Sequence, residues 1–109
     1  MLLLQNAINF TVNFSITEMN LNKRQQYFDL GNQLPNIHRH LNFDNHCYWR
    51  IALDNTLFAK WKDVVPAPAY RNITEEQLDY VIHLLRNYIK DEQLLLAHNR
   101  ISLAYRAKN

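Results

Sequence analysis

Three of the five histidines of this 109-residue chain lie between residues 38 and 47, together with its only cysteine. The nitrogen and sulfur ligands of a tetrahedral zinc site could come from these four residues: His38, His40, His46 and Cys47. Their spacing argues against such a site, because structural zinc sites usually draw on two well-separated ligand pairs. We therefore expect no metal and no cofactor, with His38 and His40 solvated in a loop and His46 in the first turn of a helix.

A nucleophilic thiol is the second chemistry that this cluster suggests. Cys47 is predicted to lie near a helix N-terminus, where the helix dipole favours the thiolate, and a neighbouring histidine could act as the base. The segment after Cys47 is apolar, which favours a packed cysteine, and no loop suited to an oxyanion hole accompanies it. A small metal- or thiol-dependent enzyme is therefore the third functional hypothesis, with five candidate residues: His38, His40, His46, Cys47 and Asp54.

Arg50 and Asp54 have the i, i+4 spacing that brings two side chains together on one face of a helix. The predicted helix over residues 45–61 is apolar on nearly every side, which is typical of a central, buried helix. Leaving a buried charge unpaired costs about 3–5 kcal/mol. We therefore expect these charges to form a network with Asn55 and a loop histidine, the alternative being that they line a pocket. The candidate polar cluster has six members: His38, His40, His46, Arg50, Asp54 and Asn55.

The composition predicts a mainly α fold: a small domain of four helices, one of which is central and apolar. Sheet-rich folds need many turns with glycine at positive φ angles, and the chain has a single glycine, Gly31. Asn22 is expected to cap a first helix that Pro35 ends, and residues 62–72, which hold two prolines, are expected to form a stiff, non-helical connector. The other helix starts are predicted at three caps: Asp44 or Asn45, Thr74 in a capping box with Gln77, and Asp91.

Residues 8–16 are the one stretch with a strand-like pattern. Apolar and polar residues alternate, which places five apolar side chains on one face: Ile8, Phe10, Val12, Phe14 and Ile16. A lone strand needs partners for its backbone groups, so residues 1–18 are predicted to form an extended arm and a two-fold dimer interface. The alternative is that Met19 is the natural start and residues 1–18 are an upstream extension. In both cases residues 19–109 form the helical domain.

Net charge and hydropathy argue against two classes of function, nucleic-acid binding and insertion into a membrane. The net charge is +2, from 12 basic and 10 acidic residues with no run of like charge, so nucleic-acid binding is not favoured. No segment approaches the ~20 apolar residues of a membrane span. One cysteine cannot form an internal disulfide, which is compatible with a reducing compartment. We expect a soluble, cytoplasmic protein that does not bind membranes.

The leading hypothesis is a small non-enzymatic interaction protein, to which we assign no catalytic residue. Its partner would be another protein, or a second copy of the chain. It would bind through an aromatic and basic loop surface or through the N-terminal arm. The alternative is a nucleic-acid-binding module, which would require one basic face and aromatic side chains on which bases can stack.

Overall fold

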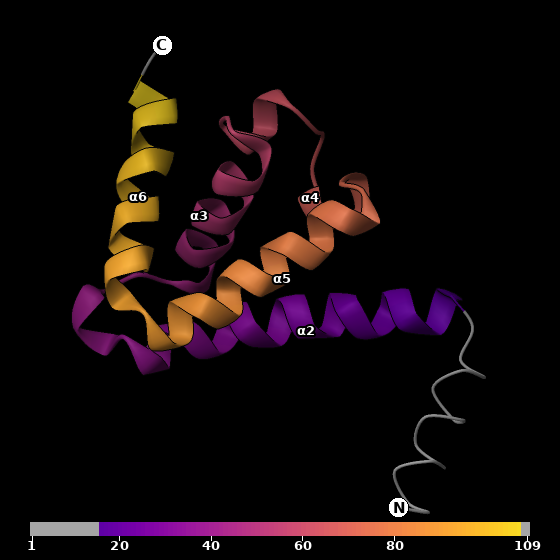
Figure 1. Cartoon of the computed structure of the whole chain (residues 1–109), viewed down its shortest axis with the longest axis horizontal. Helices are drawn as coiled ribbons and strands as arrows, with labels where there is room; N and C mark the ends of the chain where they lie inside the picture. Colours follow the sequence, from indigo (N-terminus) through magenta and orange to yellow (C-terminus); the bar gives the residue numbers. More distant parts are fainter. Residues whose placement is uncertain (1–15, 108–109) are drawn as a thin grey trace, which may run out of the picture.

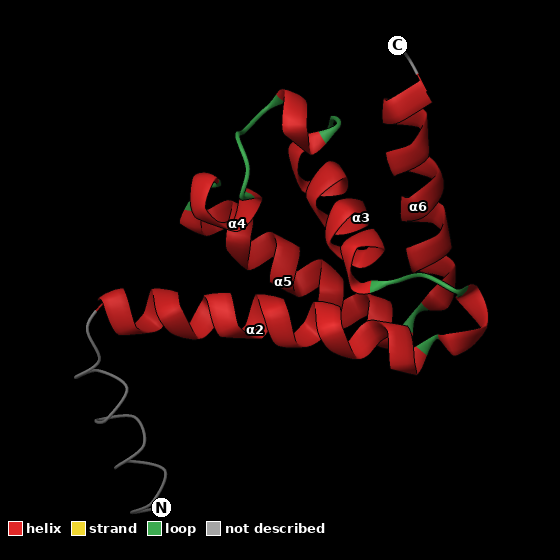
Figure 2. Cartoon of the chain, turned by 180° about the vertical axis from the view of Figure 1, so that it is seen from behind, coloured by secondary structure: helices red, strands yellow, loops and turns green. Residues whose placement is uncertain are grey.

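The computed structural model describes residues 16–107, which are helical apart from short connections (Figure 2). This range contains five α-helices: α2 (Ile16–Ile37), α3 (Asn45–Leu57), α4 (Ala69–Asn72), α5 (Glu75–Lys90) and α6 (Glu92–Ala107). Two 3₁₀ turns, η1 (Arg39–Leu41) and η2 (Trp61–Asp63), follow α2 and α3. No strand occurs among residues 16–107, and the predicted mainly α fold class is confirmed.

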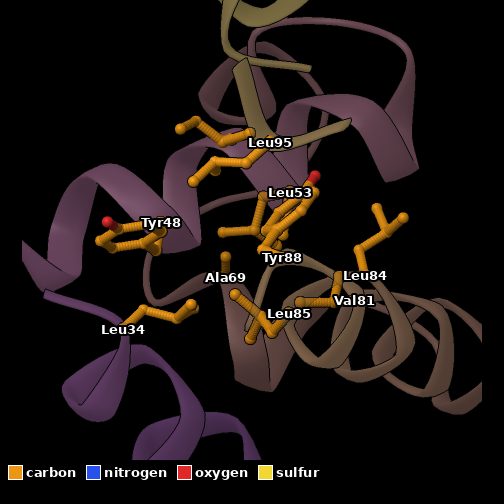
Figure 3. Packing of buried hydrophobic residues seen from close by; sticks show 11 residues of the cluster. Leu34, Tyr48, Leu53, Ala69, Val81, Leu84, Leu85, Tyr88 and Leu95 are labelled. Carbon is orange, nitrogen blue, oxygen red and sulfur yellow. The ribbon is translucent and has the colours of Figure 1, made fainter. Parts of the chain in front are cut away.

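Helix α3 is the central element, as predicted. It packs against α2, α5 and α6, and α5 also packs on α2 (Figure 1). Helices α3 and α6 stand on the same side of the layer that α2 and α5 form (Figures 1 and 2). The core between these helices is built mainly from aliphatic and tyrosine side chains (Figure 3), among them Leu34, Tyr48, Ile51, Leu53, Val81, Leu85, Tyr88 and Leu95.

Two predicted helix starts are confirmed by their capping hydrogen bonds. Thr74 Oγ1 accepts from the Gln77 N–H (3.1 Å) and Gln77 Oε1 accepts from the Thr74 N–H (2.8 Å), which completes the capping box of α5. Asp91 Oδ1 accepts from the Leu94 N–H (3.0 Å) at the start of α6. Each cap satisfies N–H groups that have no partner within the helix. The two C-terminal helices therefore begin where local hydrogen bonding dictates.

Helix α2 is longer than predicted at both ends. It begins at Ile16 rather than after a cap at Asn22, and it continues through Pro35 instead of ending there. Proline in a helix loses one hydrogen bond and crowds the carbonyl four residues earlier. Leu34 is fully buried in the core and its carbonyl accepts from the His38 N–H (3.0 Å), so tertiary packing holds this last turn in spite of the proline.

The predicted N-terminal arm lies almost entirely outside the described residues. Ile8, Phe10, Val12 and Phe14 belong to that part of the chain, so the strand and the dimer interface stay predictions. Ile16, which the alternation placed at the end of the strand, is the first residue of α2 instead. The division that the sequence suggested between residues 18 and 19 therefore falls within a continuous helix.

Helix α3 starts where predicted and ends early. Asp44 caps it, with Oδ1 accepting from the Cys47 N–H (3.0 Å). The helix ends at Leu57 because Phe58 adopts the left-handed conformation, with φ 56°. A bulky residue is uncommon at positive φ, and the Phe58 side chain is also 77% exposed. The connector over 62–72 is not free of helix, since it contains most of η2 and all of α4.

Gly31 is buried within α2, where its missing side chain makes room for Trp49. A Cβ atom at position 31 would overlap the indole ring. The Trp49 indole Nε1–H, from α3, donates to the carbonyl of Tyr27, which lies in α2 with Gly31 (3.0 Å). The role of Gly31 is therefore to let α3 dock closely on α2.

Replacing Gly31 with alanine tests this close approach. Alanine favours a helix over glycine by about 1 kcal/mol, but overlap with the Trp49 indole should cost more. We expect Gly31→Ala to lower the free energy of unfolding in urea by about 1–3 kcal/mol. In a Trp49→Ala background, where the ring is absent, the same substitution should stabilise by up to about 1 kcal/mol. An equal loss of stability in both backgrounds would contradict the close packing.

Candidate functional site

The Asp54 carboxylate is fully buried and receives four hydrogen bonds. Its Oδ2 accepts from the Ser102 hydroxyl (2.6 Å) and from Arg106 Nε (2.9 Å). Its Oδ1 accepts from the Trp61 N–H (2.9 Å) and from Arg106 Nη2 (3.2 Å). Asp54 is therefore buried and paired, as we expected. Its ionic partner is Arg106 on α6, and the prediction of Arg50 as the partner is wrong.

Arg50 joins the same network through neutral groups. Its Nη1 donates to Ser102 Oγ (2.7 Å) and its Nη2 donates to Asn99 Oδ1 (3.0 Å). Ser102 stands between the two charged residues of α3, accepting from Arg50 and donating to Asp54. Within the described part of the chain, the half-buried Arg50 forms no ion pair with a carboxylate.

Asn55 forms a separate link between α3 and α6. Its Nδ2 donates to the carbonyls of Ile51 (2.8 Å) and His98 (2.9 Å), so it does not take part in the predicted network with a loop histidine. The Tyr88 hydroxyl lies 2.6 Å from His98 Nδ1. Burial lowers the pKa of His98 and raises the pKa of Tyr88, so this contact joins a neutral phenol and a neutral imidazole.

We had expected both histidines of the loop to lie in solvent, but only one of them does. His38 is buried, and its Nε2–H donates to the Tyr88 carbonyl (2.6 Å). His40 is exposed and places Nε2 at 2.7 Å from Glu92 Oε1, while His38 Nδ1 lies 3.5 Å from the same oxygen. These contacts tie η1 to the junction of α5 and α6. We therefore interpret His38 and His40 as residues that stabilise the fold where η1 meets this junction.

The six residues of the predicted polar cluster thus fall into separate places: Arg50 and Asp54 share one network, and His38 and His40 both contact Glu92. Among residues 22–107 no group of three or more His, Cys, Asp or Glu side chains is arranged to hold a metal ion. His46 is exposed in the first turn of α3, as predicted, and its ring packs edge-on against the Trp49 ring, with 5.6 Å between centroids. Cys47 is a free, half-buried thiol beside it.

A cavity of about 510 Å³ lies where α2, α3 and α4 meet, and η2 and the end of α6 complete its wall (the helices are labelled in Figure 1). Ligand-binding clefts typically measure about 300–1,000 Å³. Three residues that the sequence singled out line this cavity, namely His46, Cys47 and Arg50. The cavity therefore brings part of the opening cluster together with residues that are distant in the sequence.

Aromatic rings form one wall of the cavity. Five aromatic residues line it: Tyr27, Phe28, Trp49, Trp61 and Tyr70. Tyr27 and Trp49 are stacked, with 5.3 Å between centroids, and Phe28 meets Tyr70 edge-on at 4.8 Å. Mutual packing of this kind fixes ring orientations and adds about 0.5–1.5 kcal/mol per pair. The wall is therefore largely ordered before anything binds.

Cations also line the cavity. Arg50 and Arg106 line it, and Lys62 Nζ lies 5.6 Å from the centroid of the Trp61 ring. Asp44 is the acidic residue in the lining, and its hydrogen bonds from Cys47 lower the pKa of its carboxyl, which keeps it ionised. The cavity thus combines fixed aromatic rings with an excess of positive charge.

The residues that complete the cavity come from distant parts of the chain, and the sequence did not predict that they share one site. Tyr27 and Tyr70 come from α2 and α4, and Arg106 comes from the last turn of α6. Arg106 turns onto Asp54, which lies 52 residues away in the sequence. The aromatic content of 12% does not say which rings share a surface.

The chain shows no significant match to a protein-family model, to a curated protein or to a solved structure. None of the helices in the described part of the chain has the length and apolar character needed to cross a membrane.

Removing the Asp54 carboxylate tests its role in the network. Asp54→Ala leaves Arg106 as a half-buried cation without its carboxylate, so we expect a loss of about 3 kcal/mol or more in the free energy of unfolding, measured by chemical denaturation. The matched control is Asp63→Ala, at an exposed carboxylate in η2, which should change stability by less than about 0.5 kcal/mol. Equally small effects of the two substitutions would show that the Asp54 network does not stabilise the fold.

Proposed function

We propose that this chain is a small non-enzymatic interaction protein that binds a partner protein in the cavity between α2, α3 and α4. The observation that carries the proposal is the lining of that cavity, which pairs an aromatic wall with arginine side chains. Tyrosine, tryptophan and arginine are the residues most enriched at the energetic centres of protein–protein interfaces. The cavity therefore has the composition of a binding site for a partner's side chains.

Preorganisation of the lining supports the same function. The Trp49 indole is stacked on Tyr27 and hydrogen-bonded to its carbonyl, and Arg106 is held by two hydrogen bonds to Asp54. Side chains that are already ordered lose little conformational entropy when a partner binds. The half-buried position of Trp49 also leaves part of its ring accessible from the cavity.

The polar groups at the cavity favour binding over catalysis. Both carboxylate oxygens of Asp54 are occupied by donors, so this residue is not poised to accept a proton from a substrate. The His46 ring packs on Trp49, and among the described residues no hydrogen bond joins it to the Cys47 thiol. A thiol enzyme would need a base oriented toward its nucleophile. The proposed location is the cytoplasm, where a free cysteine stays reduced.

Both tryptophans of the chain, Trp49 and Trp61, line the cavity, so intrinsic fluorescence reports directly on its occupancy. Partners captured on the immobilised protein would be identified by mass spectrometry, purified and titrated against it. Binding in the cavity should change the tryptophan emission. Phe28→Ala, which removes a ring from the wall, should weaken binding by about tenfold or more.

The matched control for Phe28→Ala is Phe58→Ala, which removes an exposed ring that does not line this cavity. Circular dichroism should show that both variants keep the helical fold. Phe58→Ala should bind the partner with unchanged affinity. A partner that binds the two variants equally, without altering the tryptophan emission, would place the interaction elsewhere and contradict the proposal.

A further inference from the structure

The Arg50 guanidinium carries a charge that no carboxylate neutralises within the described residues. It is half-buried, and both of its observed acceptors, Ser102 Oγ and Asn99 Oδ1, are neutral. A guanidinium has five N–H donors, and these two bonds use two of them. Partial burial strengthens the pull of such a charge on an anion, because the surroundings screen it less than water does. Arg50 is thus fixed in position, lines the cavity and has no carboxylate partner in the part of the chain that the structure describes.

The other charged residues of the lining leave the cavity with an excess of positive charge. Arg106 is balanced by Asp54, while Lys62 is exposed at the cavity and forms no ion pair among the described residues. Asp44 caps the start of α3, and six residues of helix at 1.5 Å rise each separate it from Arg50 by about 9 Å along the helix axis. Among the described residues, the lining therefore carries two cations without a carboxylate partner, Arg50 and Lys62, and the carboxylate of Asp44.

On the basis of the proposed function, we infer that the partner segment is an acidic peptide, which places an Asp or Glu side chain against Arg50, while Lys62 adds to the positive charge of the cavity. A neighbouring apolar or aromatic side chain of the same segment packs against the rings of Phe28 and Tyr70. Arginine suits this role because its planar fork can donate two parallel hydrogen bonds to one carboxylate. Neutral Ser102 and Asn99 position that fork without cancelling its charge.

The same charges argue against a nucleic-acid strand as the occupant. A strand presents a phosphate at every nucleotide and needs cations along its path. Here Lys23 is paired with Glu75 and Asp79, and the ionised Asp44 stands at the edge of the cavity itself. One fixed cation in an aromatic cavity fits a single carboxylate better than a chain of phosphates.

The test is a selection of random displayed peptides on the full-length protein. Selected peptides should contain an Asp or Glu next to an apolar or aromatic residue, and they should change the tryptophan emission when titrated. Replacing that acidic residue by its amide should weaken binding by about tenfold or more, because the half-buried charge of Arg50 then loses its partner. Selection on Arg50→Gln should lose the preference for the acidic residue and keep the preference for the apolar one.

Lys62→Gln provides a second variant at an exposed position, where the fold is not at stake, and it should weaken binding of the acidic peptide by a smaller factor. Lys90→Gln, at an exposed lysine of α5 outside the cavity, is the matched control and should leave binding unchanged.

Three results would overturn the inference, and they separate it from the proposed function. Peptides that occupy the cavity without an acidic residue would refute the inference and leave the proposed function standing. A single-stranded oligonucleotide that changes the tryptophan emission at lower concentration than the acidic peptide would identify a different occupant. A selection in which no peptide changes the tryptophan emission would refute the inference, while the proposed function is tested separately by a captured partner protein and its response to Phe28→Ala.

Discussion

A carboxylate that is shielded from solvent needs donors inside the protein, and Asp54 takes all four of its donors from outside its own helix. The Ser102 hydroxyl and the Arg106 guanidinium come from α6, and the Trp61 N–H comes from η2. One side chain of α3 therefore fixes both the last turns of α6 and the path of the chain after α3. Two of the elements that line the cavity, η2 and the end of α6, are therefore held in place by this buried charge.

The same network decides which charges face the cavity. Arg106 is neutralised by Asp54, whereas Ser102 accepts from Arg50 without changing its charge. The close docking of Trp49 on α2 holds an aromatic ring in place. A fixed cation thus lies in the same cavity as fixed rings. Such an arrangement lowers the entropic cost of binding, which is why we interpret the cavity as a site for recognition.

Local sequence patterns predicted much of the fold, but they could not predict contacts between residues that lie far apart in the sequence. The capping box of Thr74 and Gln77 acts within three residues, so the sequence pattern contains it. Burial of Asp54 followed from the apolar residues around it, but its partner did not, because Arg106 lies 52 residues away and helical spacing favoured Arg50. The passage of α2 through a proline and the assembly of the cavity from five elements likewise depend on tertiary packing, which no local spacing encodes.

Side-chain NMR of the arginines tests the central role of Asp54 most directly. If the carboxylate holds Arg106, the Arg106 Nε–H should give a separate resonance that exchanges slowly with water, unlike that of the exposed Arg71. In Asp54→Asn, which keeps the shape and removes the charge, that resonance should move toward the Arg71 signal and exchange rapidly. An Arg106 Nε–H that already exchanges like Arg71 in the unsubstituted protein would contradict the account.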